Sequence, residues 1–118
     1  KKNTDDIRES AAIDLIRMVL RRGGTVQAFD PIVTTPMMAK TIRHKQFSVA
    51  ANASAALRNA DAVVIATEWD QFRAINWRSA KRSMKRPIVV DGRNLLDPVT
   101  MHALGFRYEA VGRGKVSA

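Results

Sequence analysis

One stretch decides the fold: Ala62-Val63-Val64-Ile65-Ala66-Thr67-Glu68-Trp69-Asp70. Its first five residues are apolar without interruption, which is typical of a central parallel strand covered on both faces. Polar and aromatic residues follow directly at the carboxyl end, where α/β folds bind their ligands. We therefore predict a buried strand at 62–66 and a ligand-facing turn behind it.

Helical and extended patterns alternate on both sides of this strand. We predict helices at 10–22, 36–42, 53–59, 77–85 and 98–104, and further strands at 25–29, 87–90 and 106–111. Residues 47–49 fit either a weak strand or an extended connection, and a short turn should lead from Asp70 to Asn76. The alternation predicts an α/β fold, a Rossmann-like three-layer domain with a mostly parallel sheet and helices on both faces.

The amino-terminal end of the pattern differs from that of a usual doubly wound fold. Such a fold opens with a buried strand, and none precedes residue 10, so we expect the first strand to lie upstream of this chain. The predicted domain covers residues 1–112, and residues 113–118 are expected to form a flexible tail. No Gly-x-Gly-x-x-Gly occurs, so the chain carries no dinucleotide fingerprint of its own.

Composition excludes several classes of protein. The 118 residues include no cysteine, so the chain has neither a disulfide framework nor a thiol nucleophile. No apolar run reaches the ~18 residues that cross a bilayer, and no signal-peptide pattern is present. We expect a cytoplasmic protein without membrane contact, and we predict no metal site.

The net charge of +9 is compatible with an anionic ligand, with nucleic acid or with simple solubility. The densest basic cluster consists of Arg78, Lys81, Arg82, Lys85 and Arg86, of which 78, 82 and 85 would share one face of the predicted helix. No aromatic residues interleave with it, as they do on many surfaces that bind nucleic acid. We interpret the cluster as a solvated helix face without a nucleic-acid partner. A basic module that binds a polyanion stays open as an alternative.

The amino-terminal stretch is a candidate anion site. Ser10 suits the N-cap of the first helix, and a helix start offers N–H groups to a phosphate. Lys1 and Arg8 lie close by in the sequence. The alternative is a solvated loop with a capped helix. Asp30 also has two interpretations, as a ligand contact at a strand end and as the cap of a turn.

Three blocks carry a resemblance to a known family: Lys1–Ser10, Ala62–Asp70 and Val89–Asn94, with Leu104–Phe106 downstream. In order and spacing they resemble the C-terminal, UDP-binding domain of UDP-glucose 6-dehydrogenases, in the UDP-glucose/GDP-mannose dehydrogenase family. The likeness covers nearly the whole chain. It implies a parent homo-oligomer that oxidises UDP-glucose to UDP-glucuronate with two NAD+. Dehydrogenases of UDP-N-acetylmannosamine or GDP-mannose stay open as alternatives.

The resemblance also implies what this chain lacks. Enzymes of this family bind NAD in an amino-terminal Rossmann domain, dimerise through a central helical region and form a covalent intermediate on a cysteine. We expect those regions to lie outside this chain. The chain alone should therefore be inactive, and it should bind nucleotide weakly or undetectably.

Site residues follow from the resemblance, position by position. Lys1 and Arg93 are expected to bind the UDP-sugar, and Arg8 is expected to contact NAD; no catalytic residue is assigned. A guanidinium suits these roles because its forked N–H donors match phosphate and hydroxyl oxygens. The alternatives are an exposed turn for Arg93 and a salt bridge for Arg8. Residues 67–69 lie on the ligand side of the predicted sheet, but none is assigned a contact.

Overall fold

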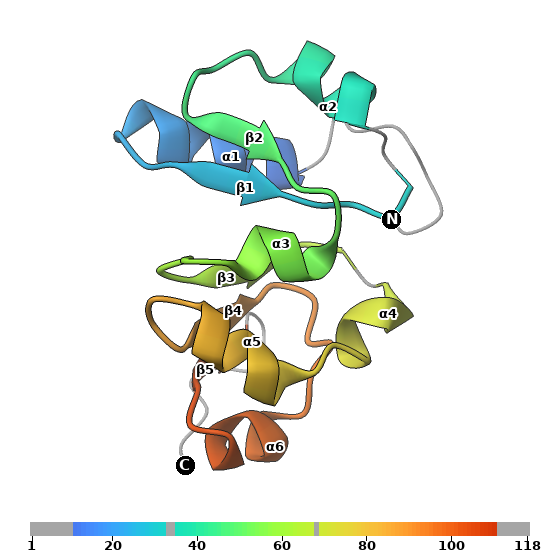
Figure 1. Ribbon diagram of the computed structural model, residues 1–118, viewed down its shortest axis with the longest axis vertical. Helices are drawn as coiled ribbons and strands as arrows, with labels where there is room; N and C mark the ends of the chain where they lie inside the picture. Colours follow the sequence, from blue (N-terminus) through green and yellow to red (C-terminus); the bar gives the residue numbers. More distant parts are fainter. Residues whose placement is uncertain (1–10, 33–34, 68, 111–118) are drawn as a thin grey trace. The chain divides into compact units, whose positions relative to one another are not determined.

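A computed structural model of the chain describes residues 11–32, 35–67 and 69–110. Helices and strands alternate in the order α1 (Ala11–Arg21), β1 (Val26–Ala28), α2 (Thr35–Thr41), β2 (Phe47–Val49), α3 (Ala53–Leu57), β3 (Val63–Ile65), α4 (Asp70–Arg73), α5 (Trp77–Ser83), β4 (Ile88–Asp91), α6 (Pro98–Ala103) and β5 (Arg107–Ala110) (Figure 1). The chain divides into two compact units, the first ending at Ala56 and the second beginning at Leu57.

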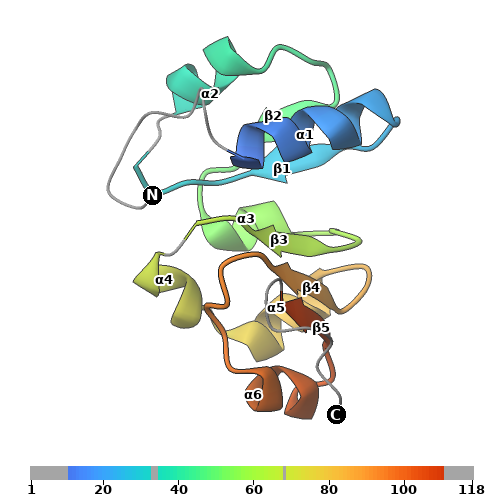
Figure 2. The ribbon, with the colours of Figure 1, turned by 180° about the vertical axis from the view of Figure 1, so that it is seen from behind.

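The first unit is built on a parallel pair of strands. Strand β1 pairs with β2 in the register Val26 with Phe47 and Ala28 with Val49. Helix α1 lies along one face of this pair, as Figures 1 and 2 show from opposite sides. Its apolar positions recur at helical spacing and bury Ile13 and Leu20 in a small core. The core also contains Ile42, with Ile16, Val26 and Phe47 packed against it.

The second unit is built on three parallel strands in the order β3-β4-β5. Val89 of the central strand β4 is fully buried, and Tyr108 of β5 is 2% exposed. Helix α5 covers one face of the sheet in both ribbon views (Figure 2). The ring of Trp77 meets Phe106 edge to face, with centroids 5.9 Å apart, which ties α5 to the start of β5.

The alternating parallel architecture predicted from the sequence is confirmed, and three details differ. The described strands form two sheets rather than one. Strand β3 lies at the edge of its sheet, and Val64 is 48% exposed, so the prediction of a central strand covered on both faces is wrong. An unbroken apolar run indicates burial on average, but it does not fix the position of a strand within its sheet. A one-turn helix, α4, replaces the turn expected before Asn76.

The structure settles two further details, the cap of α3 and the state of residues 47–49. The side chain of Asn52 caps α3, because its Oδ1 accepts the N–H of Ala55 at 2.8 Å. Residues 47–49 form a strand rather than a loose connection. In the part of the chain that the structure describes, no helix has the length and apolar character needed to span a membrane. The predicted tail at 113–118 lies outside that part.

Candidate functional site

The centre of the candidate site is Asp91, the last residue of β4. Its side chain is fully buried, and no other charged residue in the described ranges is. A buried carboxyl group is tolerated only where hydrogen bonds replace its lost water. The burial of Asp91 is explained by its hydrogen bonds, because four groups of the protein donate to its carboxylate.

Three of those donors are backbone amides of the loop that follows β4. Oδ1 of Asp91 accepts the N–H of Arg93 at 3.1 Å. Oδ2 accepts the N–H groups of Leu95 and Leu96, each at 2.8 Å. One side chain thus accepts the N–H groups that backbone carbonyls of a neighbouring strand would accept in a sheet. The loop is wound around the carboxylate, and its shape depends on that carboxylate.

The fourth donor comes from the neighbouring strand. The hydroxyl of Tyr108 in β5 lies 2.7 Å from Oδ2 of Asp91 and 3.2 Å from the carbonyl oxygen of Leu96. The parallel register that pairs Asp91 with Ala110 sets Tyr108 earlier along β5. From there its hydroxyl reaches both the carboxylate and the returning loop, which joins the loop to the sheet.

Backbone geometry at the start of the loop is also specific. The N–H of Gly92 donates to the carbonyl of Ile65 at 2.9 Å, which joins the carboxyl ends of β3 and β4. A Cβ on Gly92 would lie 3.1 Å from that carbonyl oxygen, so a larger residue would press on backbone. Asn94 has φ +55, a left-handed conformation that asparagine tolerates better than most residues. The segment between them is held in one shape.

Arg93 is presented by this loop. Its backbone is fixed by Asp91, and the residue is exposed at the carboxyl-end edge of the sheet. This is the edge at which open α/β sheets bind ligands. A guanidinium on a rigid turn suits recognition of an anion, because less conformational freedom is lost on binding.

The other residues expected in the site are only partly placed. Lys1, Arg8 and Glu68 lie outside the described residues, so the structure does not bring them together with Arg93. Thr67 and Trp69 are half-buried at the end of β3. The indole Nε1 of Trp69 is buried without an acceptor among the residues described, so this edge holds one unused N–H donor.

Helix α4 braces the loop from a second direction. The guanidinium of Arg73 donates from Nε to the carbonyl of Leu95 at 3.2 Å and forms an ion pair with Asp70. Phe72 of the same helix is buried, and its carbonyl accepts the indole N–H of Trp77 at 3.2 Å. The loop after β4 is therefore held by the sheet on one side and by α4 on the other.

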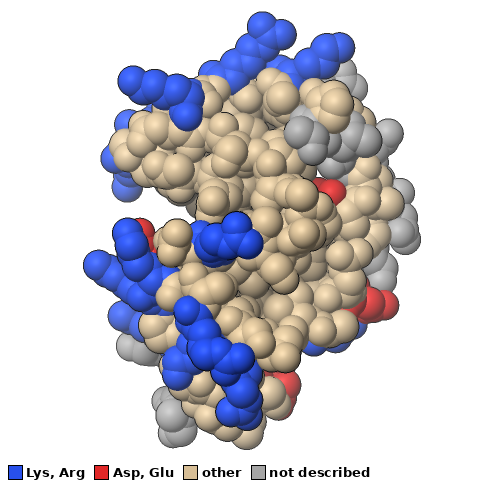
Figure 3. All heavy atoms as spheres, viewed as in Figure 1, with Lys and Arg blue, Asp and Glu red and all other residues tan. Residues whose placement is uncertain are grey.

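Two other predicted features have local roles. Oδ1 of Asp30 accepts the N–H of Ile32 at 2.8 Å, which is the turn-capping alternative. All five members of the basic cluster at 78–86 are exposed, and Figure 3 shows Lys and Arg side chains gathered over α5. Only Arg78, Lys81 and Arg82 lie on a helix face, because α5 ends at Ser83. Within the described ranges, no group of three or more His, Asp or Glu residues could hold a metal ion.

Sequence reasoning missed the parts of the site that are buried. Asp91 was quoted as part of a block, but no role was predicted for it, and Tyr108 was assigned only to a strand. One signal was available for Asp91, because an acidic residue directly after a buried strand needs donors. Nothing in the sequence indicates that Tyr108 is the residue whose hydroxyl supplies one.

Comparison with known proteins places the chain among its relatives. A family model described as the UDP-binding domain of the UDP-glucose/GDP-mannose dehydrogenase family matches residues 1–98. The UDP-glucose 6-dehydrogenase of Rickettsia prowazekii is 42% identical over 112 residues, covering 95% of this chain and 26% of that protein. The UDP-glucose 6-dehydrogenase of Pseudomonas aeruginosa is 38% identical over 116 residues, covering 96% and 26%.

A solved structure agrees with these matches. The crystal structure of an NDP-N-acetyl-D-galactosaminuronic acid dehydrogenase from Methanosarcina mazei superposes with a TM-score of 0.75 and 26% identity, over 95% of this chain and 22% of that one. The resemblance read from the three sequence blocks is confirmed. The chain spans about a quarter of the length of the curated relatives that it matches.

Proposed function

The chain belongs to the UDP-glucose/GDP-mannose dehydrogenase family as its UDP-binding domain, and we propose that it supplies part of the UDP-sugar site of an NAD-dependent UDP-glucose 6-dehydrogenase. One observation supports the proposal most. The buried carboxylate of Asp91 fixes the turn that carries Arg93 at the carboxyl-end edge of β3 and β4. That edge is where the ligand of an open α/β sheet is expected.

Arg93 and Lys1 are assigned to the UDP-sugar. The guanidinium of Arg93 would donate to the diphosphate or to a sugar hydroxyl, and charge-assisted hydrogen bonds of this kind are about twice as strong as neutral ones. Lys1 would add a point charge from the amino-terminal end. Both residues bind and orient the substrate, and neither takes part in chemistry.

The described residues do not fit a complete NAD site. Gly92 is a lone glycine after β4, and the chain has no Gly-x-Gly-x-x-Gly turn with which to cradle a pyrophosphate. We therefore assign NAD mainly to other domains of the parent enzyme and give this chain a single contact to it, Arg8. The chain also has no cysteine, so we expect it to be inactive alone. The parent is proposed to be a cytoplasmic homo-oligomer.

The test is a titration of the 118-residue chain with UDP, UDP-glucose and GDP, followed by NMR, which detects the weak binding expected of a partial site. We expect saturable shifts of the Gly92, Arg93 and Asn94 amides with the uridine nucleotides and smaller shifts with GDP. Arg93→Ala should abolish them. Arg82→Ala is the matched control, because Arg82 is also exposed in the second unit but lies on α5.

Two outcomes would contradict the proposal. Equal shifts with UDP and GDP that vanish as salt rises would indicate binding of any polyanion by the basic surface. Shifts that persist in Arg93→Ala would place the nucleotide elsewhere. The sugar stays open, since the structural neighbour is named for a nucleotide sugar other than UDP-glucose. A preference for UDP-N-acetylmannosamine or GDP-mannose over UDP-glucose would favour the dehydrogenases of those sugars, which are the alternatives that the family resemblance leaves open.

A further inference from the structure

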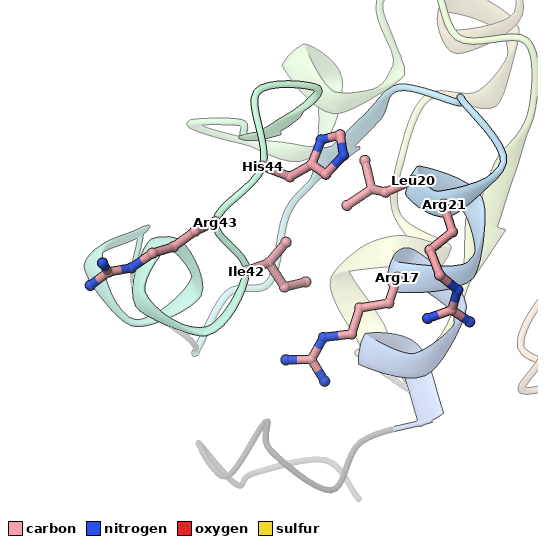
Figure 4. Close-up of a pocket in the computed structure, with 6 residues that line it drawn as sticks. All are labelled: Arg17, Leu20, Arg21, Ile42, Arg43 and His44. Carbon is pink, nitrogen blue, oxygen red and sulfur yellow. The ribbon is translucent and has the colours of Figure 1, made fainter.

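The first unit contains a cavity that the proposed function does not use. Its volume is about 250 Å³, and it lies between α1 and the segment that follows α2. The residues that line it are Arg17, Leu20, Arg21, Ile42, Arg43 and His44 (Figure 4). Leu20 and Ile42 belong to the buried core of the unit, so the floor of the cavity is apolar and its rim is basic.

The side chains on the rim differ in direction. Arg17 and Arg21 share one face of α1, because they are four residues apart on a helix. Figure 4 shows Arg17 reaching from α1 toward Ile42 and the ring of His44 turned toward Leu20, while Arg43 points away from the cavity. Arg43 therefore lines the cavity, but its guanidinium is directed away from it.

The donors at this rim are only partly used. The guanidinium of Arg17 donates to the carbonyl of Thr41 at 3.2 Å, and its four other N–H groups have no acceptor among the described residues. The Nδ1 atom of His44 accepts the N–H of Gln46 at 3.0 Å, so the proton of the neutral ring is on Nε2. Donors of this kind suit an oxyanion.

Among the described residues, Asp14 of α1 is the acidic residue nearest in sequence to Arg17, and it forms no ion pair with the arginines of the rim. No ion pair joins Arg17 or Arg21 to an acidic residue within the ranges 11–32, 35–67 and 69–110. The carboxyl end of α1 contributes about −0.5 of an elementary charge, which is smaller than the two guanidinium charges. The cavity is therefore net positive, and an anion would relieve the repulsion between its arginines.

The cavity lies at the amino-terminal ends of β1 and β2. Arg21 and His44 come shortly before β1 and β2 begin, and the backbone N–H of Val26 donates to Gln46 at this edge. Ligands of open α/β sheets bind at the carboxyl ends of their strands. We propose that this cavity is a second, independent site, which binds the phosphoryl group of a small phosphorylated metabolite through Arg17, Arg21 and His44.

The size of the cavity restricts the ligand. Pockets for drug-sized molecules have volumes of roughly 300–1,000 Å³, so this cavity suits a diphosphate or a phosphate ester with a small organic part. The apolar floor formed by Leu20 and Ile42 would contact that organic part. The cavity is open to solvent, so a polyanion lying across its rim has to be tested as a separate outcome.

The experiment is a calorimetric titration with inorganic pyrophosphate at low salt. The 118-residue chain carries Arg93→Ala in every sample, because the diphosphate contact proposed for Arg93 would also bind pyrophosphate. We expect one saturable site. Arg17→Gln combined with Arg21→Gln should weaken it about a hundredfold, which is roughly tenfold for each charge-assisted contact. Arg43→Gln is the control for each single substitution, because it removes one positive charge from the same rim but from a side chain that points away. It should change the affinity by less than about threefold.

Three results would overturn the proposal. The first is no pyrophosphate binding when the arginines of the cavity are intact, and the second is an equal loss of affinity in Arg43→Gln. The third is displacement of pyrophosphate by a single-stranded oligonucleotide, with the same loss of affinity in every arginine variant. The arginines are exposed, so all variants should keep the parent melting temperature. The UDP-induced shifts of the Arg93 loop should also be unchanged in Arg17→Gln/Arg21→Gln, which separates this site from the proposed function.

Discussion

Asp30 follows strand β1 and Asp91 ends strand β4, so both carboxylates come at the carboxyl ends of parallel strands. Asp30 is half-buried and caps the turn to Ile32 with a hydrogen bond of 2.8 Å. Asp91 is fully buried and accepts from three amides and a tyrosine hydroxyl. The same residue in the same kind of position gives a local cap in one unit and the organising centre of a loop in the other.

The difference comes from the surroundings of each strand. Strand β4 has a hydrogen-bonded neighbour on each side, and β5 brings Tyr108 to the carboxylate. The loop after β4 also turns back, so that Leu95 and Leu96 point their amides at Asp91. Strand β1 belongs to a two-stranded sheet in the described part of the chain. A carboxylate gains an organising role when several elements supply donors to it.

The largest effect should come from removing the two carboxylates in turn. Asp91→Ala leaves three amides and a hydroxyl without their acceptor, and we expect it to lower the free energy of unfolding of the second unit by about 3–5 kcal/mol. Asp30→Ala should lower that of the first unit by about 1 kcal/mol, because its hydrogen bond to Ile32 caps an exposed turn, where water can replace the lost carboxylate. Urea denaturation followed by NMR in each unit would measure both.

The outcome of this pair decides whether the comparison holds. A loss of stability in Asp91→Ala no larger than in Asp30→Ala would mean that the loop after β4 is held by other contacts, such as those of α4. If only Asp91→Ala also abolishes the UDP-induced shift of Arg93, the carboxylate serves the candidate site as well as the fold.

A smaller effect is expected from Tyr108→Phe, which tests the contribution of the neighbouring strand. The ring stays in the core, and only the hydroxyl that lies 2.7 Å from Asp91 is removed. We expect a loss of about 1–2 kcal/mol, since a buried hydrogen bond to a charged group is broken while the carboxylate keeps its three amides. Because the two groups are in contact, a double-mutant cycle with Asp91→Asn should be non-additive. An additive cycle would mean that the hydroxyl acts independently of Asp91.

Most of the fold could be predicted from local patterns. The helix at 10–22 was identified because its apolar residues recur at helical spacing, and it is observed at Ala11–Arg21. Strand β4 was identified by its β-branched run before Asp91. Two features could not be predicted: the edge position of β3, which depends on pairing between distant segments, and α4, whose four residues are too few to show a period.

The sequence motif of the candidate site could be predicted, but the hydrogen bonds that hold its loop could not. Arg93 was selected because its block resembles that of a known family, and the structure shows it exposed at the expected edge of the sheet. The dependence of its loop on Tyr108 was invisible, since it requires the register of β4 and β5. Lys1 and Arg8 stay predictions, because they lie outside the part of the chain that the structure describes.

The smallest effect is expected from Asp30→Asn, and it completes the comparison. An asparagine keeps an oxygen where Oδ1 of Asp30 accepts the N–H of Ile32, and it is as good a turn residue as aspartate. The free energy of unfolding of the first unit should therefore change by less than about 0.5 kcal/mol. Asp91→Asn should lower the free energy of unfolding by more. The NH₂ group of asparagine would replace one oxygen of Asp91, and its N–H donors would face the N–H or O–H donors that this oxygen accepts. If both variants were neutral by urea denaturation, hydrogen-bond chemistry would not distinguish the two aspartates, and the burial of Asp91 alone would have to explain their difference.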